Sequence, residues 1–132
     1  MKPGRAAALI AAVTCLAPAA FAACPPTAVH GVPLQAGPVQ LAWRAEPLQI
    51  STGQPFVLHL QLCPAQAVLT RVDATMPEHR HGMNYRPSLH SLGAGRWRVD
   101  GLLWHMAGRW ELRFDVQHDG STHTLKQDVV LR

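Results

Sequence analysis

The sequence contains little cysteine, few acidic residues and no long apolar segment after residue 22. It has three cysteines and eight Asp and Glu residues in 132 positions, and its formal net charge is +4. A membrane-spanning helix needs about 20 consecutive apolar residues, so no such helix is expected after residue 22. The arginines are interleaved with acidic and apolar residues rather than gathered in a basic stripe, so nucleic-acid binding is not expected either.

The chain begins with MKPGRAAALIAAVTCLAPAAFAACPP, which has the layout of a secretory signal peptide. Lys2 and Arg5 precede a short apolar run, and small residues follow up to a cleavage site of the A-x-A type near Ala22. We therefore expect residues 1–22 to be removed and the mature protein to reside in the periplasm. No membrane insertion is expected after cleavage.

The cysteines fit this location. Cys15 would leave with the signal peptide, and Cys24 and Cys63 would remain as a pair in an oxidising compartment. A Cys24–Cys63 disulfide is therefore predicted. The alternative is a lipoprotein anchored at Cys24, which would leave Cys63 unpaired; the preceding FAA is a poor match to a lipidation signal because Phe21 stands where Leu is usual.

The mature chain shows period-two alternation and no long helical periodicity, which is typical of half-buried strands. Stronger alternation occurs in residues 55–63, 68–76 and 109–117, and weaker alternation in 96–104 and 122–132. The residues expected to share one face are Phe56, Leu58, Leu60 and Leu62 in the first segment, Val68, Val72, Ala74 and Met76 in the second, and Trp110, Leu112, Phe114 and Val116 in the third. We predict an all-β protein, an antiparallel immunoglobulin-like β-sandwich of six or seven strands over residues 39–132, preceded by an irregular proline-rich arm at 23–38.

Strand direction predicts which loops share an end of this sandwich. If each consecutive strand reverses, the loops at 77–84 and 104–108 both follow strands of the same direction. They should therefore meet at one end, while Cys63 and the start of the strand at Val39 should lie at the other end.

The two loops that are expected to meet are rich in histidine and methionine. Imidazole nitrogens suit copper, zinc and nickel, and soft thioethers select Cu(I). Structural zinc sites favour cysteine, and the mature chain has none to spare. The pattern therefore predicts a copper site, with Cu(I) favoured over Cu(II). The candidate ligands are His79, His81, Met83, His105 and Met106.

Two residues of these segments have structural alternatives. Met76 is in phase with Val72 and Ala74, which favours a core position over a ligand role. His105 continues the phase of Val99 and Leu103, so it is either a ligand or a buried histidine that hydrogen-bonds a carbonyl.

Several of these motifs resemble the YtkA-like family of small exported β-sandwich domains and its FixH-like relatives. The resemblance covers roughly residues 45–118. Its three elements are Met76, Pro77, His79, His81, Gly82 and Met83, then Gly95, Trp97 and Val99, then Met106, Gly108, Trp110 and Leu112. The resemblance implies a binding or accessory role in copper handling or in maturation of haem–copper oxidases, without catalysis.

Two functions follow as hypotheses. The first is a periplasmic copper-binding carrier or accessory protein. The second is a metal-free protein-interaction domain that assists assembly of a periplasmic or membrane redox complex. An enzyme is not expected, because no Ser/His/Asp or Cys/His arrangement stands out. Haem ligation by a His/Met pair is chemically feasible, but the chain has no C-x-x-C-H motif.

Overall fold

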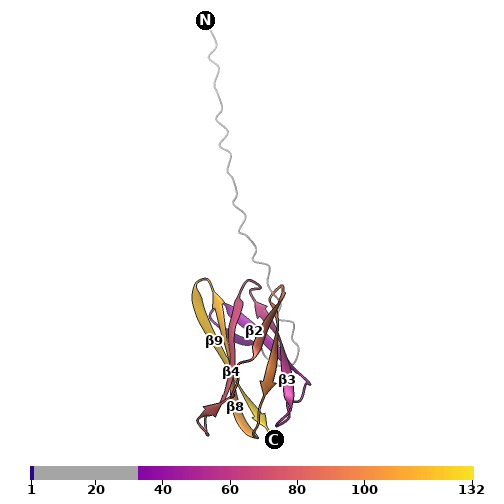
Figure 1. Ribbon diagram of the computed structural model, residues 1–132. Coiled ribbons are helices and arrows are strands. Elements are labelled where there is room, and N and C mark those ends of the chain that lie inside the picture. Colours follow the sequence, from indigo (N-terminus) through magenta and orange to yellow (C-terminus); the bar gives the residue numbers. More distant parts are fainter. Residues whose placement is uncertain (2–32) are drawn as a thin grey trace.

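The computed structural model describes Met1 and residues 33–132, so the predicted signal peptide and most of the predicted arm lie outside the described residues. All regular structure in the described part is β-strand, arranged as two antiparallel sheets that pack on one shared core (Figure 1). The strands are β1 (Leu34–Ala36), β2 (Val39–Glu46), β3 (Pro55–Cys63), β4 (Val68–Met76), β5 (His81–Gly82), β6 (Ser88–Gly93), β7 (Arg96–Leu103), β8 (Gly108–His118) and β9 (Ser121–Leu131).

The strand order confirms the predicted immunoglobulin-like β-sandwich. One sheet has the order β1-β2-β3-β7-β6 and the other has the order β5-β4-β8-β9. Without the two shortest strands, four strands face three in the order found in immunoglobulin constant-type domains. The described residues thus contain seven longer strands, as predicted, and two short edge strands, β1 and β5, that were not predicted.

The end of the predicted arm is not irregular. Leu34 to Ala36 form β1, which pairs with β2 through Leu34↔Leu41 and Ala36↔Val39. Gly37, with a φ of 57°, lies in the two-residue turn that reverses the chain between the two strands. The sandwich therefore begins before Val39, and the proline content of the arm concealed this strand.

The core is built from the predicted alternation of β3 and β8. The side chains that β3 buries are Phe56, Leu58, Leu60 and Leu62, and those that β8 buries are Trp110, Leu112, Phe114 and Val116. Trp104 and Trp110 are both fully buried, and their rings are stacked at 5.2 Å between centroids. This stacked pair fills the core near the start of β8.

Three register shifts interrupt the strand pairing in residues 33–132, and two of them affect the predicted alternation. In β4 the register slips between Leu69 and Arg71, so Leu69 is buried while Val68 is 46% exposed; the prediction for Val68 was wrong. A second slip separates Phe56 from Leu58 opposite β7, beside Gly101 with its φ of 83°. An extra residue on one strand turns every later side chain to the opposite face.

Cys63 and the start of the strand at Val39 were predicted to lie together at the end opposite the two histidine-bearing loops, and this is confirmed. Gln40 pairs with Cys63, so the start of β2 and the end of β3 lie together. Cys24 lies outside the described residues, and its pairing with Cys63 stays a prediction. Within residues 33–132 there is no helix with the length and apolarity required to cross a membrane.

Candidate functional site

The two histidine-bearing loops meet at one end of the sandwich, as predicted. The ring centroids of His79 and His81 are 5.7 Å apart, and those of His81 and His105 are 5.3 Å apart. The planes of His81 and His105 differ by 29°, so these two rings stack. Three imidazoles from two loops therefore form a row, which we call the histidine row, with His81 in the middle. It lies where β8 begins, at the lower end of the molecule in Figure 1.

Tight backbone geometry places His81 in the row. The amide of His79 donates to the carbonyl of Met76, which closes a turn directly after β4. Arg80 adopts a φ of 53°, and the chain then returns as β5 with His81 directly opposite Met76. A Cβ on Gly82 would lie 3.0 Å from the carbonyl oxygen of Ala74, so glycine allows β5 to approach β4 this closely.

The buried pair Trp104 and Trp110 lies against the histidine row, and Trp110 makes the contacts with the imidazoles. Trp110 lies edge-on to His81 at 6.3 Å and to His105 at 5.7 Å between centroids. The indole Nε1 of Trp110 donates to the carbonyl of Met106 at 3.0 Å, which fixes the 104–107 loop against β8. The sequence placed Trp110 only on the same strand face as Leu112, and this pattern did not reveal its contact with both histidines.

Exposure differs along the histidine row. His79 and His105 are exposed, and His81 is half-buried. The alternative of a buried His105 is therefore wrong. The cause is the β-bulge at Gly101, after which Leu102 and Trp104 are buried and His105 points outward.

The methionines near the histidine row are more deeply buried than His79 and His105 and pack against the core. Met76 is buried, with 1% of its surface exposed, which confirms its predicted core position. Met83 and Met106 are half-buried and pack against the core. Met83 also lines a cleft between β4 and β6 together with Arg71 and Tyr85. Met83 follows His81 by two residues and Met106 directly follows His105, and each thioether already has packing partners.

The acidic residues around the histidine row are held in ion pairs. Arg109 donates to Glu78 at 2.8 Å and to Asp128 at 3.0 Å. The hydrogen bond from Arg109 is the main cause that lowers the pKa of the Glu78 carboxyl. Glu111, which lines a shallow pocket with His81, pairs with Lys126 at 2.8 Å. Within residues 33–132, the three imidazoles of the row are thus potential metal ligands that take part in no ion pair.

The rings are close together but do not already converge on one point. Among the described residues, no group of three or more His, Cys, Asp or Glu side chains is arranged so that it could hold a metal ion. Stacked imidazoles direct their nitrogens alongside each other rather than toward a shared centre. Ligation by this set therefore requires side-chain rotation, for which the exposed rings of His79 and His105 have room.

Comparison of the chain with protein-family models, with curated proteins and with solved structures found no match.

Proposed function

We propose that this protein is an exported copper-binding accessory or carrier protein, and that the histidine row is its metal site. The observation that carries the proposal is the contact of three imidazole rings from two separate segments at one end of the sandwich, two of them exposed and one half-buried. Neutral imidazole is a common copper ligand. The proposal assigns no catalytic step to the protein.

Cu(I) suits this set because it accepts few and soft ligands. Two or three of His79, His81 and His105 would supply nitrogens, and Met83 or Met106 would add a thioether. Rotation of an exposed histidine between staggered rotamers costs little compared with the formation of a metal–nitrogen bond. Calcium and magnesium fit poorly, because the neighbouring carboxylates are engaged with Arg109 and Lys126.

Copper binding by these residues would depend on pH. A histidine nitrogen that takes up a proton cannot bind a metal ion, so acidification competes with the metal. We expect the copper affinity to fall as the pH is lowered. A site built mainly from Met83 and Met106 would show little of this dependence, because thioethers do not titrate.

A competitive titration of Cu(I) against a chromophoric chelator tests the proposal. His81→Ala should weaken binding far more than His118→Ala, because His81 is the middle ring of the row and His118 lies at the other end of β8. His118 is a suitable control, since it is also half-buried and lies 3.3 Å from a carboxylate of Asp119.

Equal copper affinities of these two variants would reject the histidine row as the site. The alternative, a metal-free interaction domain that assists assembly of a periplasmic or membrane redox complex, would then take its place. The exposed histidines would serve as a docking surface in that case. Metal analysis of protein purified from its native compartment distinguishes the two functions directly.

A further inference from the structure

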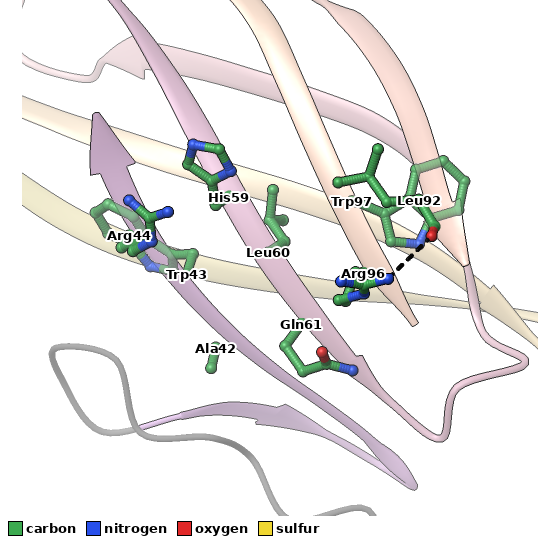
Figure 2. Close-up of a pocket in the computed structure, with 9 residues that line it drawn as sticks. All are labelled: Ala42, Trp43, Arg44, His59, Leu60, Gln61, Leu92, Arg96 and Trp97. Atoms are coloured by element: carbon green, nitrogen blue, oxygen red, sulfur yellow. Dashed lines mark hydrogen bonds between the residues drawn. The ribbon is translucent and has the colours of Figure 1, made fainter. Parts of the chain in front are cut away.

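A groove on the outer face of the larger sheet carries a second set of chemical groups, away from the histidine row. It has a volume of about 270 Å³ and crosses β2, β3 and β7. Figure 2 shows Arg44 and His59 on one side of it and Arg96 on the other, with Gln61 between them. No carboxylate is among the residues that line it.

Of the nine arginines in residues 33–132, four are in ion pairs with a carboxylate and five are not. The arginines that form an ion pair with an Asp or Glu side chain are Arg71, Arg98, Arg109 and Arg113. Arg44 and Arg96 have no such partner in residues 33–132. Within the described part of the chain, Arg96 makes only long side-chain hydrogen bonds, at 3.4 Å, to the carbonyls of Leu92 and Gly93. The bond to Leu92 is drawn in Figure 2.

The carboxylates at the border of the groove already have hydrogen-bond partners. His59 Nε2 is 2.6 Å from Glu46 Oε2, and this hydrogen bond is the main cause that lowers the Glu46 pKa; Arg44 contributes less. Arg98 holds both carboxylate oxygens of Asp100, at 2.7 to 3.0 Å. Both border acids therefore have hydrogen-bond partners other than Arg44 and Arg96, and the three arginines outnumber the two carboxylates, so the groove and its border keep a net positive charge.

We propose that this groove binds an acidic, extended segment of a partner protein through Arg44 and Arg96, with Leu92 providing an apolar contact. Arginine recognises carboxylates through paired N–H donors. Leu92 is 50% exposed and lines the same groove. The groove is small for enclosing a free ligand, since small-molecule pockets usually exceed about 300 Å³.

The spacing of the two arginines sets the spacing of the acids. Arg44 is opposite His59 on β3, and Arg96 is opposite Gln61 two residues further along the same strand. With about 4.8 Å between strands and about 3.4 Å per residue, their Cα atoms are roughly 12 Å apart. Acidic residues separated by three to four positions in an extended segment span the same distance.

The binding should be weak and sensitive to salt. An exposed ion pair contributes a small free energy, so Arg44→Gln or Arg96→Gln should each weaken binding about threefold, and the double variant about tenfold. Screening at high ionic strength should remove most of the affinity. Both side chains reach solvent, so these variants should keep the thermal stability of the parent protein.

The test is an NMR titration of the whole mature protein with two synthetic peptides of equal composition. One peptide carries glutamates at every fourth position among serines and leucines; the other carries its glutamates together at one end. The spaced peptide should bind more tightly and should shift the side-chain Nε–Hε signals of Arg44 and Arg96. Arg86→Gln is the matched control, because Arg86 also has no carboxylate partner in residues 33–132 but lines the cleft between β4 and β6.

Three results would overturn the proposal. If Arg86→Gln weakens peptide binding as much as Arg44→Gln does, general charge rather than the groove is responsible. If the two peptides bind equally, the spacing argument fails. If neither peptide binds but phosphatidylglycerol vesicles bind in a manner that requires Arg44 and Arg96, the occupant is an anionic lipid surface instead of a protein segment.

Discussion

The two ends of the sandwich differ in the contacts that hold their loops together. At the end that holds the β3–β4, β6–β7 and β8–β9 connections, the turns are tight and backbone packs against backbone. The amide of Leu62 donates to the carbonyl of Gly95 at 2.8 Å, and a Cβ on Gly95 would lie 2.5 Å from the carbonyl oxygen of Leu62. At the other end, which carries the histidine row, side chains make contacts between loops, such as the stacked rings of His81 and His105, and the imidazoles of His79 and His105 are exposed.

The turn end therefore contributes mainly to stability, and the other end presents the side chains proposed to bind metal. The turn end has no space for an added atom at Gly95, so packing requires glycine at this position. At the histidine end, a Cβ on Gly108 would meet the mobile methyl group of Met76 at 2.8 Å, and the amide of Gly53 donates to the carbonyl of the buried Trp104. The buried Trp104 and Trp110 therefore lie beneath histidine rings of which two, His79 and His105, are exposed.

The largest effect is expected at the turn end. Gly95→Ala should reduce the free energy of unfolding by about 4 kcal/mol, because the new Cβ collides with backbone and Gly95 has a φ of 74°. Gly93→Ala is the matched control: its φ is 80°, but no atom lies within 4 Å of the added Cβ. It should cost only about 1 kcal/mol of backbone strain. Urea denaturation measures both, and similar losses would show that backbone conformation rather than packing limits this end.

The predicted Cys24–Cys63 disulfide would strengthen the same end. Cys63 terminates β3 opposite Gln40, and the bridge would close a loop of about 38 residues, worth roughly 3 to 4 kcal/mol in the chain-entropy model. Reduction should lower the denaturation midpoint accordingly. Thiol labelling of the unreduced, unfolded mature protein should detect no free cysteine. Two free thiols, or a lipid on Cys24, would contradict the prediction.

A smaller, pH-dependent effect is expected at Asp115 in β8. Burial alone would raise the pKa of this carboxyl, but hydrogen bonds from Thr124 at 2.7 Å and Arg113 at 3.0 Å outweigh it, and the pKa is lowered. A lowered folded-state pKa stabilises the protein above the ordinary carboxyl value, about 4, and this contribution disappears as the pH falls through the folded-state pKa.

Thr124→Val should therefore cost about 1 to 2 kcal/mol at neutral pH, and the loss should vanish in acid as Asp115 becomes protonated. Thr122→Val is the control, because Thr122 is exposed on the same strand and pairs with Gln117 instead. Unfolding measured across a pH series checks this. A constant difference between wild type and Thr124→Val at every pH would show that the hydroxyl does not act through the carboxylate.

The sequence predicted the sandwich because period-two alternation in β3 and β8 reflects burial on one face. It predicted the shared end of the two loops because strand direction depends only on the number of reversals. It failed where one residue interrupted the alternation at Val68, and it left His105 open between a ligand and a buried histidine. Gly101 inside a strand pattern is a signal for a bulge, and it would have favoured the exposed alternative for His105.

Other features of the two sites could not be read from the sequence. The row of His79, His81 and His105 depends on how two loops fold over Trp110, a contact between residues distant in the chain. The lack of carboxylate partners for Arg44 and Arg96 depends on which acids other side chains have already engaged. These properties depend on tertiary contacts between residues that are distant in the chain, and local sequence patterns do not predict such contacts.

The smallest effect on stability is expected at the histidine end. In the double variant His79→Ala/His105→Ala, two exposed rings are removed while His81, the tryptophan pair and the Trp110–Met106 hydrogen bond remain. Surface substitutions of this kind usually change the free energy of unfolding by less than about 0.5 kcal/mol. Cu(I) affinity should nevertheless fall at least as far as in His81→Ala, because only one imidazole of the row is left. A variant that loses several kcal/mol of stability would mean that the rings hold the two loops together, and the contrast between a rigid turn end and a chemically accessible histidine end would then be wrong.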